Sequence, residues 1–306
     1  MGLFDSLFGK DEALPSQVTF TLDQAGHTYE DGSVGLLPTS LTITPDDRRV
    51  AVIGLNGAGK TTMLNIISGA EDPDEGRVLF AKGARVGYLE QEAIEMADQP
   101  IFEEVMSSQV EVLEAERRLH KLEAELGEAP TPQQLAAAGR ARDAYEVLGG
   151  YTIEAKVRSV MFGLGFKEGD LSRCTTEVSG GWQMRIALAK LLIRNPEVLL
   201  LDEPTNHLDA ESILWLEQFL HQYKGAVIAV THDRYFMDNV AEWICEVDRG
   251  HLYPYKGNYS TYLETKAKRL EIQGAKDAKL AKRLKNELEW VRSSPKARQA
   301  KNKARL

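Results

Sequence analysis

The stretch Gly54-Leu55-Asn56-Gly57-Ala58-Gly59-Lys60-Thr61 decides the fold of this chain. It fits the phosphate-binding loop pattern G-x-x-x-x-G-K-[ST] and follows an apolar run, residues 50–53, that predicts a buried strand. The glycines allow backbone N–H groups to surround phosphate oxygens at a helix N-terminus, and Thr62 continues that helix. We expect Lys60 to reach the outer phosphates and the Thr61 hydroxyl to bind Mg²⁺. The sequence therefore predicts an α/β nucleotide-binding protein.

Length and composition limit the class of protein. The 306 residues are 43% hydrophobic, enough for one large or two modest domains. Apolar runs such as residues 198–201 and 226–230 are far shorter than the roughly 20 residues of a membrane span, and no secretory signal is present. Cys174 and Cys245 lie far apart without C-x-x-C spacing, which argues against a disulfide or zinc framework. We expect a cytoplasmic protein without a membrane partner.

Charge is distributed unevenly along the chain. Residues 264–306 contain 14 Lys or Arg and 5 Asp or Glu, a local charge of +9 within a chain of net charge −9. Residues 1–263 therefore carry −18. An acidic body repels nucleic acid and a basic tail attracts it, so any contact with nucleic acid is expected through the tail.

Two carboxylates end a second apolar run. Residues 198–201 predict a buried strand, and Asp202 and Glu203 follow it directly. Parallel strands deliver such residues to a ligand at their carboxyl ends. We expect Asp202 to hold the Mg²⁺ shell and Glu203 to orient or deprotonate the water that attacks the γ-phosphate.

Two further polar residues follow predicted strands. His232 comes just after the apolar run 226–230, where a neutral imidazole would bond a γ-phosphate oxygen and help to position Glu203 and the water. Gln91 follows a short strand and offers its amide to Mg²⁺ and the attacking water. We therefore assign Glu203, His232 and Gln91 to catalysis, and Thr61, Gln91 and Asp202 to the metal.

The segment Ser179-Gly180-Gly181-Trp182-Gln183 precedes an apolar helical pattern and places amides and a hydroxyl at a positive helix end. It resembles the signature motif of ATP-binding cassette proteins, and the order of all the motifs matches that family over about residues 18–255. The resemblance implies that two cassettes enclose two ATP molecules. It assigns Ser179, Gly180, Gly181 and Gln183 to the γ-phosphate of the opposite nucleotide and Tyr29 to stacking on adenine.

Residues 203–209, Glu203-Pro204-Thr205-Asn206-His207-Leu208-Asp209, resemble the form found in the ABC-F subfamily, whose members have tandem cassettes and act on ribosomes. Gln91 and Ser179 lie 88 residues apart, which leaves room for an insertion. Apolar residues recur at spacings of 3 and 4 from Val112 to Leu126, and a capping pattern follows at Thr131. The insertion, about residues 103–150, is similar to the helical arm of ABC-F proteins; the alternative is a slightly enlarged helical subdomain.

The basic tail completes the resemblance. A charged helix from about Tyr262 and a second basic helix from Lys296 are similar to the inter-cassette linker of ABC-F proteins, which in that family reaches ribosomal RNA and tRNA. The alternative is a helix with a solvated charged face. We expect either the front half of a tandem protein, cut within its linker, or a half-size cassette that dimerises.

The predicted organisation is a leader at residues 1–17, an ABC cassette at 18–257 and a basic helical linker at 258–306. The predicted function is an ATPase that needs ATP, Mg²⁺ and a second cassette, and that acts on the ribosome to regulate translation. The alternative is the ATPase subunit of an ABC transporter, which would need a membrane partner.

Overall fold

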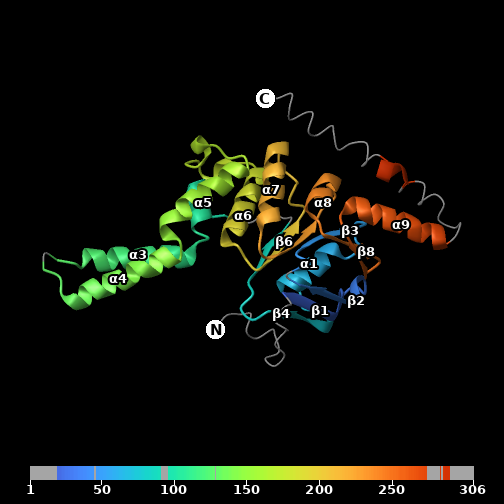
Figure 1. The fold of residues 1–306 in the computed structure, drawn as a ribbon, viewed down its shortest axis with the longest axis horizontal. Coiled ribbons are helices and arrows are strands. Elements are labelled where there is room, and N and C mark those ends of the chain that lie inside the picture. Colours follow the sequence, from blue (N-terminus) through green and yellow to red (C-terminus); the bar gives the residue numbers. More distant parts are fainter. Residues whose placement is uncertain are drawn as a thin grey trace. The chain divides into compact units, whose positions relative to one another are not determined.

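The computed structural model describes residues 19–44, 46–90, 96–127, 129–273, 283 and 285–289. The expected leader at 1–17, Gln91 and the basic helix expected from Lys296 lie outside these residues. The chain divides into two compact units. The first contains residues 1–84 and 223–306, and the second contains residues 85–222. Figure 1 labels most of their elements.

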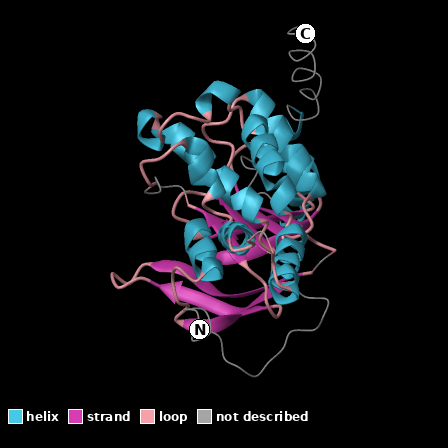
Figure 2. Cartoon of the chain, turned by 90° about the vertical axis from the view of Figure 1, so that its left-hand side faces the viewer, coloured by secondary structure: helices cyan, strands magenta, loops and turns pink. Residues whose placement is uncertain are grey.

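One sheet of the first unit is antiparallel, with strands in the order β2-β1-β4 (magenta in Figure 2). Its strands are β1 (Phe20–Thr28), β2 (Val34–Ile43) and β4 (Glu75–Phe80). Phe20 lies opposite both Ile43 and Phe80. Phe20 and Leu22 are fully buried, as expected from the alternation of side chains along a strand. The sheet therefore covers an apolar face.

The other strands of the first unit follow the order β7-β3-β8-β9. They are β3 (Arg49–Gly54), β7 (Ala226–Val230), β8 (Trp243–Asp248) and β9 (His251–Lys256), accompanied by helices α1 (Lys60–Ser68), α8 (Arg234–Val240) and α9 (Tyr259–Gln273). β3 runs parallel to β7 and β8, and β9 is antiparallel to β8. All five residues of β7 are buried, as the continuous apolar run predicts.

The second unit pairs β5 (Val86–Leu89) in parallel with β6 (Val198–Asp202) and adds helices. The helices are α2 (Ile101–Met106), α3 (Val110–Ala124), α4 (Pro132–Val147), α5 (Gly150–Gly163), α6 (Gly180–Arg194) and α7 (Ala210–Gln222), with short 3₁₀ turns at Glu168–Asp170 and Thr175–Glu177. Glu104 of α2 is only 3% exposed and forms an ion pair with Lys190 of α6. The strands predicted at residues 50–53, 198–201 and 226–230 are confirmed, and so is the α/β fold class.

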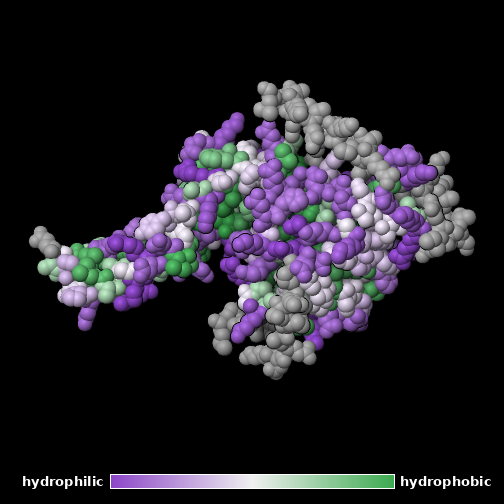
Figure 3. Space-filling view, viewed as in Figure 1, coloured by the Kyte–Doolittle hydropathy of each residue, from purple (hydrophilic) through white to green (hydrophobic). Residues whose placement is uncertain are grey.

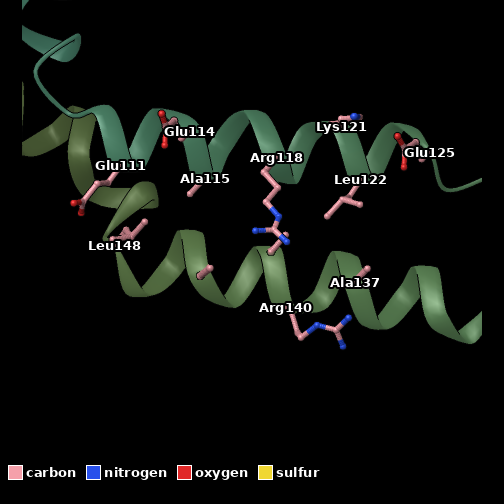
Figure 4. Close-up of a pocket in the computed structure, with 12 residues that line it drawn as sticks. Glu111, Glu114, Ala115, Arg118, Lys121, Leu122, Glu125, Ala137, Arg140 and Leu148 are labelled. Carbon is pink, nitrogen blue, oxygen red and sulfur yellow. The ribbon is translucent and has the colours of Figure 1, made fainter. Parts of the chain in front are cut away.

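Helices α3 and α4 lie side by side within the second unit (Figure 1). The capping box expected at Thr131 forms. The Thr131 hydroxyl accepts from the backbone N–H of Gln134, and the Gln134 side-chain oxygen accepts from the backbone N–H of Thr131. Arg142 of α4 donates to Glu123 of α3 at 2.6 Å. A groove of about 770 Å³ runs between the two helices, and Arg118 points into it from α3 (Figure 4). Figure 3 shows apolar side chains on the surface of this hairpin.

Helix α9 packs within the first unit. Tyr262 and Leu263 are buried in a cluster with Ala51 and Ile244, and Leu288 packs against the same cluster. Helix α9 begins at Tyr259, whereas the sequence predicts a charged helix only from about Tyr262. A part of the segment expected to be a linker is therefore integral to the packed core.

Candidate nucleotide site

The phosphate loop connects β3 to α1 in the first unit. Gly57 and Gly59 adopt left-handed backbone conformations, with φ of 75° and 103°. A Cβ at Gly59 would lie 2.0 Å from the carbonyl oxygen of Gly35, so that only glycine fits there. Gly59 is also the N-cap of α1, so the N–H groups of the first helical turn begin at the loop. Backbone amides in such a loop and at the start of a helix can bind an anion.

Lys60 is the cation of this loop. Its side chain is folded back, and Nζ donates to the carbonyl oxygens of Gly54 and Leu55, both at 3.0 Å. The residue is only 9% exposed, whereas Leu55 at the tip of the loop is 79% exposed. The ammonium group is thus held beside the mouth of the loop. Thr61 is exposed next to it, and Thr62 is buried.

Tyr29 is joined directly to the phosphate-loop helix. Its hydroxyl lies 2.6 Å from the Thr62 hydroxyl, and its ring meets His27 edge-on at 4.8 Å. His27 in turn lies 3.4 Å from Asp74. The aromatic side chain expected to stack on adenine therefore has a fixed place beside the loop and remains 37% exposed.

His232 follows β7 in the first unit and is exposed. Asp233 caps α8 by accepting from the amides of Tyr235 and Phe236. The Thr231 hydroxyl accepts from the Asp233 amide at 3.1 Å. These hydrogen bonds hold the backbone on both sides of His232 and so fix where its side chain starts at the end of β7.

The two carboxylates lie at the end of β6 in the second unit. Asp202 is 3% exposed, and Glu203 takes a left-handed φ of 50°, which is unusual for a residue other than glycine. Both line a cavity of about 110 Å³ together with Arg185, Asn206 and His207. Polar and apolar side chains both line the cavity, and Glu203 reaches it from a turn with a left-handed backbone.

The segment resembling the signature begins α6 in the second unit. Ser179 is the N-cap, but its side chain makes no capping hydrogen bond. Gln183 donates to the Thr175 carbonyl oxygen at 3.3 Å. A Cβ at Gly181 would lie 3.3 Å from the His207 ring, so this glycine is in close contact with the loop after β6. The segment is thus anchored to the loop that carries Glu203.

Comparison with protein families supports this geometry. A family model described as ABC transporter matches residues 36–206, and a second model with the same description matches residues 245–306. The chain belongs to the ABC transporter family. Residues 36–206 include the phosphate loop, the signature segment and the two carboxylates. The cassette assignment and the α/β fold are therefore shown.

The relatives of this ABC cassette include ABC-F proteins, which confirms the resemblance stated above. The present chain is 48% identical over 258 residues to "Energy-dependent translational throttle protein EttA" of Mycobacterium tuberculosis (strain ATCC 25618 / H37Rv), and the match covers 84% of this chain and 46% of that protein. It is 39% identical over 293 residues to the EttA of Escherichia coli (strain K12), covering 95% and 52%. The chain spans about half the length of these curated relatives.

A solved structure shares the fold. The ATP-binding cassette MJ0796, in a dimeric post-hydrolysis state bound to ADP and Pi, matches with a TM-score of 0.54 and 22% identity, over 78% of this chain and 98% of that one. Within the part of this cassette that the structure describes, no helix is long and apolar enough to cross a membrane.

The donor set of this ABC cassette fits a magnesium nucleotide. In the first unit, the glycine-rich backbone amides and Lys60 suit phosphate oxygens, and the exposed Thr61 hydroxyl is an oxygen ligand of the kind that Mg²⁺ prefers. In the second unit, the Asp202 carboxylate is a ligand of the same kind. Among the described residues, no group of three His, Cys, Asp or Glu could hold a metal ion by itself.

Arg185 is a site residue that no sequence motif predicted. Its guanidinium is 11% exposed and bonds the carbonyl oxygens of His207 and Leu164. Partial burial would raise the pKa of Asp209, but hydrogen bonds from Ser212 and the contact with Arg185 outweigh it and hold that pKa below its ordinary value. The sequence shows only that an arginine follows the signature segment in the same predicted helix. Its position in the helix does not show whether the side chain is buried or exposed.

Proposed function

We propose that this ABC cassette binds ATP with Mg²⁺, hydrolyses it when a second cassette completes the site, and acts on the ribosome to regulate translation. The observation that carries the proposal is the phosphate loop, in which left-handed glycines and the folded Lys60 form a cradle for phosphate. Relatives at 39–48% identity are named translational throttle proteins, which points to the ribosome as the target.

In this proposal ATP lies in the phosphate loop, with Tyr29 against the base. Lys60 and the loop amides would bind the phosphates, and Thr61, Asp202 and Gln91 are the residues that would hold Mg²⁺. Mg²⁺ supplies neutralisation of charge on the phosphates. The other nucleotide contacts are those assigned from the family resemblance: residues 54–62 of one cassette and Ser179, Gly180, Gly181 and Gln183 of the other.

Hydrolysis is assigned to Glu203 with His232. Glu203 orients the attacking water and accepts its proton, and His232 holds a γ-phosphate oxygen in the position that favours the in-line attack. The cleavage of ATP removes the ligand that favours the closed pair of cassettes. The arm at about residues 103–150 and the linker at 258–306 are proposed to deliver that change to ribosomal RNA and tRNA.

The test is Glu203→Gln, which keeps the size and polarity of the side chain but removes the base. ATP affinity should persist, while turnover should fall on the order of a hundredfold or more. Glu211→Gln is the matched control, because Glu211 is an exposed carboxylate in the first turn of α7. Unchanged turnover in Glu203→Gln would remove Glu203 from this role.

The target is tested by sedimentation. The Glu203→Gln protein with ATP should sediment with purified ribosomes, and less of it should do so with ADP. The same protein mixed with membrane vesicles tests the transporter ATPase. Association with vesicles and none with ribosomes would favour that alternative.

A further inference from the structure

Arg185 connects three separate backbone segments of the second unit. Its Nε and one terminal nitrogen donate to the His207 carbonyl oxygen, at 2.8 and 2.5 Å. The other terminal nitrogen donates to the Leu164 carbonyl oxygen at 2.9 Å and to Asp209 at 3.3 Å. The guanidinium also lies over the Trp182 ring, 4.5 Å from its centre. A planar donor fork of this kind fixes geometry in a way that a lysine cannot.

The loop that Arg185 holds is conformationally strained. Glu203 and His207 both have left-handed φ values, 50° and 67°. Such residues cost free energy and persist only where the surroundings impose the conformation. Two bonds inside the loop, from the Asn206 amide to the Glu203 carbonyl oxygen and from the Leu208 amide to that of Thr205, are 3.1 and 3.3 Å long. The contacts of Arg185 with the His207 carbonyl oxygen are an external restraint on this turn.

The same side chain is rigidly joined to the signature segment. Arg185 lies in α6, whose N-cap is Ser179, and a helix transmits a displacement of its first turn to the next. A Cβ at Gly181 would lie 3.3 Å from the His207 ring, so the helix start also lies near the loop. The signature segment and the Glu203 turn are thus connected through Arg185.

We propose that Arg185 is a positioning residue that couples the signature segment of this cassette to its Glu203. Engagement of the signature segment by the nucleotide of the opposite cassette moves the start of α6, and Arg185 sets the Glu203 turn in response. Through this coupling, one ATP site reports its occupancy to the carboxylate of the other. The inference rests on the proposed function of Glu203.

The first measurement does not depend on hydrolysis. Hydrogen exchange of the Asn206 and Leu208 amides is compared in the wild-type chain and in Arg185→Lys, without nucleotide. Exchange should become about tenfold faster in the variant, because a charged hydrogen bond to the loop is lost. Arg194→Lys is the matched control, since Arg194 is exposed at the end of the same helix. Unchanged exchange in Arg185→Lys would overturn the proposal.

The second measurement separates positioning from binding. In steady-state ATP hydrolysis by the full chain, over a range of protein concentrations, kcat of Arg185→Lys should fall by about tenfold or more, with ATP affinity within twofold of wild type. A loosened loop with unchanged kcat would overturn the coupling. Lost ATP affinity together with lost kcat would assign Arg185 a general structural role instead.

Two further variants keep the outcomes distinct. Asp209→Asn weakens the contact with Arg185 but keeps the acceptor for the Ser212 amide, and it replaces Arg185→Lys if that variant does not fold. It should shift loop exchange in the same direction by a smaller factor. Glu203→Gln is measured in parallel. If it retains turnover, the proposed function of Glu203 fails, while the exchange result alone decides whether Arg185 holds the turn.

Discussion

Replacement of Lys60 by alanine tests the phosphate cradle most directly. In the structure Nζ donates to two loop carbonyl oxygens, at Gly54 and Leu55, and nucleotide binding must exchange these bonds for bonds to phosphate. A bond from the ammonium group to phosphate joins two ionised groups, whereas a bond to a carbonyl oxygen has only one, so the exchange favours phosphate by about 1–1.5 kcal/mol for each of two bonds. The net loss in Lys60→Ala is about 2–3 kcal/mol, which weakens the Kd for ATP by about 30- to 150-fold.

The assay is calorimetric titration of ATP with Mg²⁺ into the full chain. Folding is checked by thermal denaturation without nucleotide, and the midpoint should move by less than about 2 °C, because the Leu55 carbonyl oxygen also accepts from the Ala58 amide. Lys82→Ala is the matched control, since Lys82 is exposed in a turn of the same unit. A Kd for Lys60→Ala within threefold of the wild-type value, a threshold of about 0.65 kcal/mol, would refute the assignment of the loop as the main phosphate site.

Residues 274–306 carry 11 Lys or Arg and 3 Asp or Glu, and their deletion should leave ATP affinity intact but reduce RNA affinity and its dependence on salt concentration. If RNA affinity falls equally steeply with salt in the intact and the shortened chain, the linker assignment is contradicted. Lys190→Met should leave the Glu104 carboxylate buried without its cation, with Gln99 as the remaining hydrogen-bond donor, and should lower the free energy of unfolding by about 3 kcal/mol in chemical denaturation. Glu104→Gln in the same chain should recover part of that loss. Burial raises the pKa of Cys245 to about 12, so a thiol reagent at pH 8 should modify the partly exposed Cys174 well before Cys245. Equal modification rates would show that the Cys245 thiol is accessible.

The raised pKa of Cys245 also has a defined sign for stability. The thiol of the unfolded chain ionises near pH 8.5, and that of the folded chain near 12. Its contribution to stability is therefore complete below about pH 8.5 and is lost as the pH rises toward 12. A Cys245→Ala chain should show a weaker loss of stability over this alkaline range.

Local sequence patterns predicted those elements whose form depends on near neighbours. The continuous apolar runs at residues 50–53 and 226–230 have no polar face, and such runs fit only strands buried on both sides. The capping box at Thr131 depends on residues three positions apart, so the spacing alone indicated where α4 begins. The left-handed Gly57 and Gly59 follow from the loop pattern in the same way.

Contacts between distant segments could not be read from the sequence. Tyr29 meets Thr62 because β1, β2 and α1 bring residues 33 positions apart together, and a single tyrosine carries no mark of that partner. The start of α9 at Tyr259 was likewise obscured, because its buried Tyr262 and Leu263 lie in a sequence that is highly charged overall.

The sequence by itself determined that this chain is an α/β ABC cassette, because the phosphate loop, the signature segment and the Asp202-Glu203 pair are contiguous motifs that need no tertiary information. Only the tertiary structure decided what holds these motifs in place. Arg185 reaches His207 and Leu164 across 22 and 21 positions of sequence. These hydrogen bonds depend on how α5, α6 and the loop after β6 pack together. They could not be predicted, because helical periodicity indicates which face of a helix a residue lies on but not which residues it contacts.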